Sequence, residues 1–537
     1  MILMSLAKHL AKGRACIDCR RRKVKCGGEI PACKRCVRGG YGLDCQYVDE
    51  RGKTGVQLLE ASITKFEARL AELQSLATQK QPVLEIYVPG RGGLCQNVSD
   101  LYFRLVPPRH AMRPATSLPA GWWEQSRMPL EVTNLLMDHF APYAFQLGFF
   151  MHGPRLCHII FRQSNFPPPS PNLLNVIYLW GIHLSGDDRL LAYESLFLNR
   201  AVQFDLSAQQ PQHVVHNIQA DILLAAFFLR FGKHSSAIHR LNSAVSLCIS
   251  YGLHRQASNQ SAFALHLPPP RDSIDRGERL DAFWTTFLLC KALDVQEHAS
   301  FRILATMDEF IDTPFPLEMS FYEGGSVPSN PNGVLTLKSF LKSPGADPSN
   351  GILALTAKAA ALFERAKYYS AQWQLVQHPE ERKFEMDLLY FTKAVPPLSQ
   401  FVGPYTKYTW ITVMTLLQVA IIHLHGSRKY HDSNQKCLDA AQTAANLIAS
   451  FDDQKTVQHI HPIMAPLWFT VCETLIDGIL ESHIKDFMVG TNEHLIQSLT
   501  TVVQAMETCS RNCYEMTEAH LLRLNGMFHR ISFKLTL

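Results

Sequence analysis

The sequence has no run of 18 or more apolar residues, and only 18% of its 537 residues are charged. The best candidate for a membrane span, residues 410–424, is interrupted by Thr, Gln and His, so we interpret it as a buried helix. The N-terminus lacks the apolar core and small-residue cleavage site of a secretory signal. Hydrophobic residues make up 47% of the chain, enough to bury a large core. We therefore expect a soluble intracellular protein without a membrane partner.

The usual catalytic signatures are missing as well. The sequence contains no Walker loop, no G-x-G-x-x-G after a strand, no G-x-S-x-G and no H-E-x-x-H. Two close histidine pairs, at 213/216 and 459/461, lack a carboxylate or cysteine at ligand spacing, so we interpret them as surface or helix-cap residues. The segment 181–188 has suggestive residue types but also fits a polar helix end. We therefore expect that the protein is not an enzyme.

Basic charge and cysteine are concentrated at one end of the chain. Residues 1–53 hold 13 Lys and Arg against 5 Asp and Glu, whereas the other 484 residues hold 39 basic and 42 acidic residues. Six of the 14 cysteines fall within residues 16–45. Because intracellular thiols stay reduced, this dense group favours metal binding over disulfides, and we interpret the other eight cysteines as small buried residues. The charge asymmetry predicts a polyanionic partner for the N-terminus.

The six cysteines repeat one half-motif, C-x2-C followed by a third cysteine after six or eight residues. They are Cys16, Cys19, Cys26, Cys33, Cys36 and Cys45. A C-x2-C pair places two thiolates on one turn, where both can reach a tetrahedral zinc ion. Two such ions need eight ligand positions, and no histidine lies among the cysteines to add to the six. The count closes if two thiolates each bridge both metals, so the sequence predicts two zinc ions per chain in a binuclear cluster.

A basic run, Arg-Arg-Arg-Lys-Val-Lys at 20–25, lies between the second and third cysteines. No Gly or Pro interrupts it, so we expect a short helix over Arg20–Lys25. Two zinc ions and six thiolates would carry a charge of −2, which leaves the loaded module with a charge of about +6, attractive to DNA phosphates. The alternatives are a zinc-stapled protein-interaction module, or a basic run that serves only in nuclear import.

The stretch Ala15–Cys26, together with Pro31 before Cys33, resembles the signature of the fungal binuclear zinc cluster transcription factors. The resemblance implies that Cys16 and Cys33 bridge the metals, that one zinc ion also takes Cys19 and Cys26, and that the other takes Cys36 and Cys45. It further implies that CGG-like triplets in double-stranded DNA are read in the major groove. The implied DNA-binding residues are Lys23 and Arg22 for bases, and Arg20 and Lys25 for phosphates. Lys and Arg donate readily to guanine O6 and N7.

After a linker at 48–55, apolar residues recur at spacings of three and four through 56–80. This pattern predicts a short coiled coil that pairs two copies of the chain. The expected dimerisation residues are Val56, Leu59, Ile63, Phe66, Leu70 and Leu73. The alternative is an amphipathic helix lying on the large domain. The resemblance also implies a dimerisation element at this position.

Residues 131–537 form apolar segments with helical spacing and sustain no strand alternation, so the fold class is mostly α. We expect a 1–13 tail, a 14–47 cluster domain of two zinc-stapled helices, a loose connection at 81–130, and a large all-α domain at 131–537. Segments 223–232, 244–255 and 279–284 resemble the regulatory middle homology domain of the same family. The preferred hypothesis is that the protein is a nuclear, DNA-binding regulator of RNA polymerase II transcription. The alternative is a helical scaffold or enzyme that the zinc module only localises.

Overall fold

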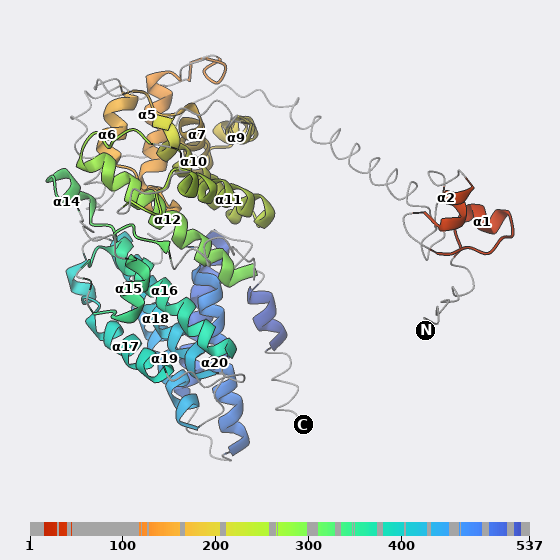
Figure 1. The fold of residues 1–537 in the computed structure, drawn as a ribbon, viewed down its shortest axis with the longest axis vertical. Coiled ribbons are helices and arrows are strands. Elements are labelled where there is room, and N and C mark those ends of the chain that lie inside the picture. Colours follow the sequence, from red (N-terminus) through yellow and green to blue (C-terminus); the bar gives the residue numbers. More distant parts are fainter. Residues whose placement is uncertain are drawn as a thin grey trace. The chain divides into compact units, whose positions relative to one another are not determined.

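The computed structural model describes residues 15–28, 32–39 and 45. It also describes residues 118–527, with gaps at 120, 126–127, 162–166, 204–210, 257–264, 266, 298–309, 328–334, 346, 348, 373–379, 402–403, 427–430, 451–460, 462, 486–492 and 513–519. The chain divides into two compact units, residues 1–87 and 88–537. Every regular element in the described residues is a helix, which confirms the predicted all-α class (Figure 1).

The small unit contains two short helices, α1 (Ile17–Arg21) and α2 (Lys34–Arg38). They pack against each other around the cysteines, which, apart from Asp18, are the buried residues described in this unit. Ala15, Val24 and Ala32 contact this cluster only from its edge. In the described part of the small unit, cysteine therefore takes the place of an apolar core.

The first part of the large unit is a layer of helices and 3-10 turns, which Figure 1 colours from orange to green. It contains α5 (Leu130–Phe140), η1 (Ala141–Leu147), α6 (Gly153–Ile160), α7 (Pro171–Ser185), α8 (Asp188–Leu191), α9 (Glu194–Val202), η3 (Pro211–His213), α10 (Val214–Arg230), α11 (His234–Ser250) and α12 (Ser273–Glu297). Helix α10 is buried almost all round, and it packs against α7, α11 and α12.

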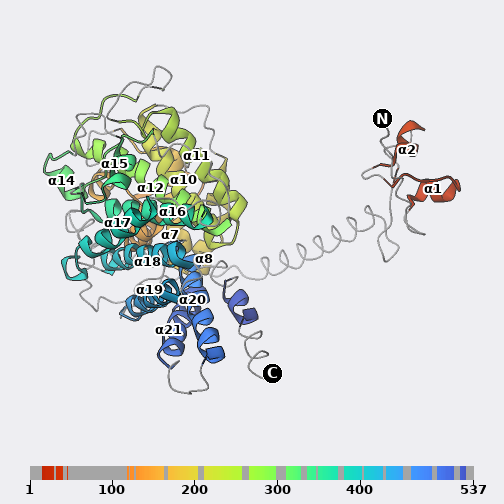
Figure 2. The same cartoon turned by 60° about the horizontal axis from the view of Figure 1, so that its bottom comes forward.

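The second part follows in green and blue (Figure 2). It contains α14 (Met319–Glu323), α15 (Thr336–Lys342), α16 (Ile352–Gln372), α17 (Glu381–Ala394), η5 (Leu398–Gln400), α18 (Pro404–Gly426), α19 (His431–Ala449), α20 (Met464–Lys485) and α21 (Glu493–Asn512). Helix α18 packs against α16, α17, α19 and α20, whereas α12 contacts α10 and α11 on one side and α16 on another. Helix α12 thus joins the two parts into one core.

Helix α18 carries the apolar stretch that the sequence assigned to a buried helix. Residues 406–426 are long and apolar enough to cross a membrane, but 78% of the most apolar window is buried inside the large unit. Leu416, Leu417 and Val419 are fully covered by neighbouring helices. The helix therefore occupies the core position that the sequence predicted.

The large unit includes residues upstream of 131. Trp122 is only 2% exposed and packs its ring on Tyr193 and Phe197, with ring centroids 4.9 Å and 5.8 Å away. The Arg200 guanidinium donates to the carbonyl of Trp123 at 2.7 Å. The described part of segment 118–125 is thus anchored on α9.

His216 is half-buried rather than a surface residue, although its contact is with a helix end, the N-cap residue Ser170 of α7. Its Nδ1 accepts the backbone N–H of Ser170 at 3.2 Å, and its ring stacks on His213 with centroids 5.7 Å apart. Burial, together with the charges of His213 and Arg271, lowers the pKa of His216 to about 4. The side chain is therefore a neutral structural acceptor that ties α10 to the start of α7.

The segment 181–188 is the polar helix end that was expected: α7 ends at Ser185, and Asp187 caps α8.

Candidate metal centre and nucleic-acid interface

The two C-x2-C pairs adopt the same local geometry. Cys16 and Cys33 are the N-cap residues of α1 and α2, and their sulfurs accept the backbone N–H of Cys19 and Cys36, both at 3.4 Å. An N-cap side chain reaches the N–H three residues later, so the x2 spacing produces this bond directly. Both donors and the helix dipole favour negative charge on sulfur. The predicted repeat is thus a structural repeat, with one thiolate-capped helix per half.

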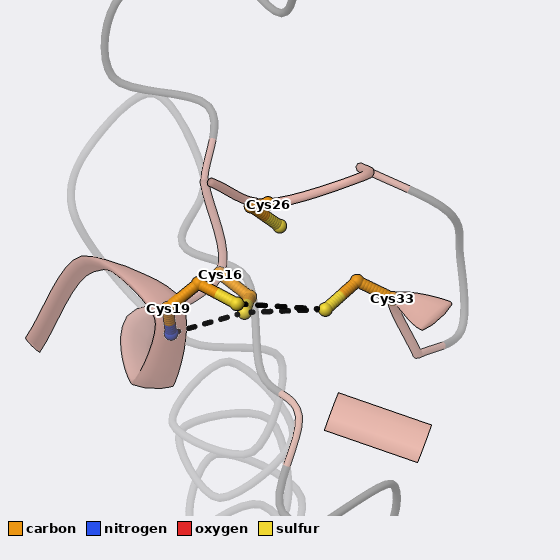
Figure 3. A group of neighbouring side chains, drawn as sticks. All are labelled: Cys16, Cys19, Cys26 and Cys33. Carbon is orange, nitrogen blue, oxygen red and sulfur yellow. Dashed lines mark hydrogen bonds between the residues drawn. The ribbon is translucent and has the colours of Figure 1, made fainter. Parts of the chain in front are cut away.

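The six sulfurs converge into two overlapping groups. Cys16, Cys19, Cys26 and Cys33 form one group, and Cys16, Cys33, Cys36 and Cys45 form the other; in each, the sulfurs lie within 4.8 Å of one another. Figure 3 shows the first group, with its side chains pointing toward a common centre. Cys16 and Cys33 belong to both groups. These are the two residues that the family resemblance implied as bridging ligands.

The separations of the sulfurs suit tetrahedral zinc. The Cys16 sulfur lies 3.9 Å from that of Cys33 and 3.8 Å from that of Cys36, and the Cys19 and Cys33 sulfurs are 3.6 Å apart. Four sulfurs at zinc–sulfur distances of about 2.3 Å define a tetrahedron with edges of about 3.8 Å. The module therefore fits two zinc ions, which would supply the rigid cross-links that its missing apolar core does not.

The cysteine side chains are buried, and burial disfavours an uncompensated thiolate charge. All six side chains are at most 8% exposed. Burial raises the pKa of the thiols of Cys16, Cys19 and Cys36 above the ordinary cysteine value, to about 12 for Cys36. For Cys33, burial is outweighed by hydrogen bonds from the Cys36 N–H and the neighbouring cysteine side chains, which lower the pKa of Cys33 to about 6 instead. Without a cation Cys16, Cys19 and Cys36 are therefore held as thiols, and metal binding must displace their protons. Zinc affinity should accordingly rise with pH.

The prediction of a helix over Arg20–Lys25 is wrong, because α1 ends at Arg21. Lys23 has a positive φ of 55°, and its N–H donates to the carbonyl of Arg20 at 3.2 Å. The N–H of Val24 donates to the carbonyl of Cys19 at 3.0 Å. These two bonds form a Schellman turn, which reverses the chain at a position usually held by glycine. Lys23 is the only non-glycine residue with positive φ among the described residues.

Ligand geometry explains this early end and could have predicted it. Cys19 and Cys26 must reach one metal, yet seven helical residues would separate them by about 10 Å along the axis. Their sulfurs lie within 4.8 Å instead. The chain must therefore turn between them, and residue propensity alone misses this requirement.

The predicted DNA-binding side chains are all solvent-exposed. Arg20 lies in the last turn of α1, Arg22 and Lys23 in the turn after it, and Lys25 in the segment that leads to Cys26. Arg21 is exposed too, but its guanidinium pairs with Asp18 at 2.6 Å. Helix α2 adds exposed cations at Lys34, Arg35 and Arg38. The buried sulfur cluster is thus surrounded by a basic surface to which both halves of the repeat contribute.

The predicted dimerisation residues, Val56 to Leu73, lie outside the described residues.

Comparison with known proteins places this module in a family. Residues 14–54 match the fungal Zn(2)-Cys(6) binuclear cluster domain. A lactose regulatory protein, LAC9, from Kluyveromyces lactis is 37% identical over 73 residues, which cover 14% of this chain and 8% of that protein. A transcription regulator, galc, from Aspergillus niger is 36% identical over 64 residues, or 11% of this chain and 8% of that protein.

An ABC-transporter-regulating transcription factor from Aspergillus oryzae is similar over the same kind of short stretch. It is 34% identical over 70 residues, or 13% of this chain and 8% of that protein. This chain thus matches only about a twelfth of the length of the relatives. The comparisons confirm the zinc cluster domain, and the predicted resemblance of the helical body to a middle homology domain stays a prediction.

Proposed function

We propose that this chain, whose residues 14–54 are a binuclear zinc cluster domain, is a sequence-specific DNA-binding regulator of RNA polymerase II transcription that acts in the nucleus. The observation that carries the proposal is a pair of four-sulfur groups sharing two cysteines, enclosed by exposed Lys and Arg. Relatives of the module are named as regulators of transcription, which supports a regulatory rather than a catalytic role.

In this proposal Cys16 and Cys33 are the bridging ligands. One zinc ion takes these two with Cys19 and Cys26, and the other takes them with Cys36 and Cys45. The assignment is supported by the presence of Cys16 and Cys33 in both sulfur groups. Each of these two sulfurs also accepts the N-cap hydrogen bond of a helix, so it would link both metals to the start of α1 or α2. The metals hold the two helices in one fixed orientation toward the DNA.

Lys23 and Arg22 are the proposed base readers, and Arg20 and Lys25 the phosphate contacts. The Schellman turn supports the role of Lys23, because a chain reversal lifts this residue clear of the helix and exposes its side chain. Lys and Arg at such a position can donate to guanine O6 and N7, which suits a CGG-like triplet. Non-glycine residues in strained backbone conformations are frequent at functional sites.

Dimerisation through residues 56–80 is the remaining part of the proposal. A seam of Val56, Leu59, Ile63, Phe66, Leu70 and Leu73 would tie two zinc modules together and turn the second DNA contact into an intramolecular event. The target would then be two triplets related by two-fold symmetry, at a spacing set by the linker and the coil.

A binding titration on the full chain tests the proposal. Labelled duplexes would carry two CGG triplets at a series of spacings, one triplet, or a scrambled sequence of equal composition. We expect tight binding to one paired spacing, weaker binding to the single triplet, and loss of both after zinc chelation. Equal binding to all three duplexes would overturn the proposed sequence specificity.

An Ile63→Pro variant tests the dimer separately. Proline breaks a helix interior, so this variant should sediment as a monomer while keeping two zinc ions and single-triplet binding. A wild-type chain that is monomeric at micromolar concentration and shows no preference for paired triplets would rule out the coiled coil, while leaving DNA binding by the module intact.

A further inference from the structure

The large unit contains a cavity of about 170 Å³ at the joint between its two parts. Helices α10, α12, α16 and α18 contribute to its wall, together with the segments 145–150 and 317–319. Much of the wall is apolar, formed by Phe149, Phe150, Ile222, Leu289, Met319 and Ile352 among others. An apolar cavity of about 150 Å³ admits benzene, so this space suits a molecule with a single ring or a short hydrocarbon body.

One acid in this wall has no partner. Asp281 of α12 is 7% exposed, lines the cavity, and its Oδ1 forms no hydrogen bond within the part of the chain that the structure describes. Burial raises the pKa of Asp281 well above its ordinary value, and the nearby carboxylates of Glu318 and Glu278 raise it further. An unpaired buried carboxyl group is costly, so its presence requires a physical reason.

The neighbouring acids differ from Asp281 in being committed to the backbone. Glu318 Oε1 accepts the N–H of Ile352 at 2.7 Å, and Glu278 Oε1 accepts the N–H of His152 at 3.0 Å. These bonds anchor α16 and the segment before α6. Only Asp281 is left over for a ligand.

No cation of the protein serves Asp281 from the cavity wall. Among the described residues, the wall includes Asp281 and Glu318 but neither Lys nor Arg. His461 also lines the cavity, and burial lowers the pKa of its side chain to about 4, so this histidine is neutral near pH 7. The cavity is therefore acidic and apolar at once.

The cavity wall is held in place by hydrogen bonds. The Gln219 side chain accepts the N–H of Phe150 at 2.7 Å and donates to the carbonyl of Gly148 at 3.1 Å. Gly148 has a positive φ of 85°, and a Cβ there would come within 3.0 Å of Ile222. Elsewhere in the wall, the Tyr408 hydroxyl accepts the N–H of His461 at 3.0 Å. A wall fixed in this way loses little entropy when a ligand enters.

We propose that this cavity binds a small organic ammonium ion, with the ammonium group on Asp281 and a compact hydrocarbon body against the aromatic and aliphatic wall. The ammonium supplies the hydrogen-bond donor and the positive charge that Asp281 lacks. When the ammonium binds, the proton that burial holds on Asp281 is released to solvent, and the ion pair stabilises the carboxylate. The described wall offers no Lys or Arg to a carboxylate or phosphate, and a neutral alcohol offers a donor without the charge. The proposal concerns the large unit alone and is independent of the proposed DNA binding.

Thermal unfolding and calorimetric titration of the full chain without DNA test this site. The probes are 2-phenylethylamine, 2-phenylethanol and phenylacetate, which share a ring and chain length but carry positive, zero and negative charge. We expect 2-phenylethylamine to raise the Tm of the large unit and to bind at least about tenfold more tightly than 2-phenylethanol. Phenylacetate should not bind measurably.

Three variants separate the causes. Asp281→Asn keeps the shape, so it should fold and lose the preference for the amine while its affinity for 2-phenylethanol stays within about twofold. Asp439→Asn changes an exposed acid on α19 and should behave as wild type. Ala226→Leu fills the cavity from α10 and should weaken both the amine and the alcohol.

Two results would overturn the proposal. The first is equal binding of all three probes, or of none, by the wild-type chain. The second is an Asp281→Asn chain that retains the preference for the amine. Because DNA is absent from these titrations, either result would leave the proposed transcriptional role untouched.

Discussion

The two units reach a defined structure by opposite means. In the small unit the described buried residues are six cysteines and Asp18, and the apolar side chains only touch the edge of the cluster. The large unit buries one large apolar cluster that runs from Trp122 to Leu524, and a small second one of Leu280, Met319 and Tyr322. A module without a core depends on its metal, whereas a helical body depends on the transfer of apolar surface out of water. The same chain should therefore respond to two separate kinds of perturbation.

Removing the metal should have the largest effect, and it should be confined to the small unit. Cys33→Ser replaces a sulfur common to both ligand groups, so the module should lose both zinc ions and unfold. Native mass spectrometry should report two zinc ions in the wild type and none in the variant. The thermal transition of the large unit should stay unchanged.

Cys472→Ser provides the matched control for this result. Cys472 is fully buried in α20, so the change should destabilise the large unit and leave two zinc ions in place. A Cys33→Ser chain that retained both ions would show that the two ligand groups do not share this sulfur.

A core truncation is the converse experiment. Trp284 of α12 is fully buried, stacks on Phe315 with ring centroids 4.7 Å apart, and donates its indole N–H to the carbonyl of Pro314 at 2.8 Å. Trp284→Ala should lower the free energy of unfolding of the large unit by about 3–5 kcal/mol, because it removes a large apolar surface and leaves a cavity. Chemical denaturation monitored by circular dichroism measures the loss, and Trp284→Phe should recover part of it. Reduced zinc content in the alanine variant would contradict the independence of the units.

The contrast between the units also explains what the sequence could predict. Cysteine count and spacing predicted a binuclear cluster, because zinc geometry is local and strict, whereas the membership of each ligand group was implied only by the family resemblance. Periodicity predicted that the body is helical, although it marks helix starts poorly: α11 begins at His234, where His-Ser-Ser carries no apolar pattern. The turn at Lys23 and the unpaired Asp281 were missed. The turn at Lys23 follows from the metal that Cys19 and Cys26 must share, which residue propensity does not describe. The surroundings of Asp281 depend on tertiary packing, which brings Glu318 near α12.

The buried acid Glu278, near the cavity, should make the stability of the large unit depend on pH. Burial raises the pKa of Glu278 from 4.5 to about 7. A carboxyl group with a raised folded-state pKa contributes stability that is complete below about pH 4.5 and is lost as pH rises to about 7. Near pH 8, Glu278→Gln should therefore stabilise the large unit by up to about 3 kcal/mol, since glutamine can still accept the N–H of His152. Below pH 4.5 the variant should show no gain. An equal gain at both pH values would assign the effect to packing instead.

On the basic surface, substitutions with smaller effects should separate residues that recognise bases from residues that only attract the DNA phosphates. Lys23→Ala should reduce discrimination between CGG and a mismatched triplet by about 1–3 kcal/mol, because a base contact carries sequence information. Arg20→Ala should weaken all duplexes alike and reduce the slope of log K against log salt by about one. Fluorescence anisotropy over a salt series distinguishes the two. A Lys23→Ala chain that weakened every duplex equally would remove Lys23 from the base-reading role.

The smallest expected change in stability concerns a turn that occurs in both units. Helix α11 ends in the same Schellman geometry as α1: the N–H of Gly252 donates to Ile249 at 3.0 Å, and that of Leu253 to Cys248 at 2.8 Å. The left-handed residue is Gly252 in the large unit, with φ of 68°, and Lys23 in the small unit. A side chain in this conformation costs about 1 kcal/mol relative to glycine. Gly252→Ala should therefore destabilise the large unit by about 1 kcal/mol, and Lys23→Gly should stabilise the zinc-loaded module by a similar amount.

The position of Lys23 makes that last pair of changes informative, because stability and DNA reading should move in opposite directions. Lys23→Gly should lose triplet discrimination as fully as Lys23→Ala does, while the module resists denaturation better than wild type. Denaturant titration of the zinc-loaded chain, monitored by the DNA-independent release of zinc to a chromogenic chelator, measures the first quantity, and anisotropy the second. If Lys23→Gly left the module no more stable than Lys23→Ala, the left-handed turn would carry no strain. A lysine at the position that glycine holds after α11 would then cost no stability, and its presence would not point to a function.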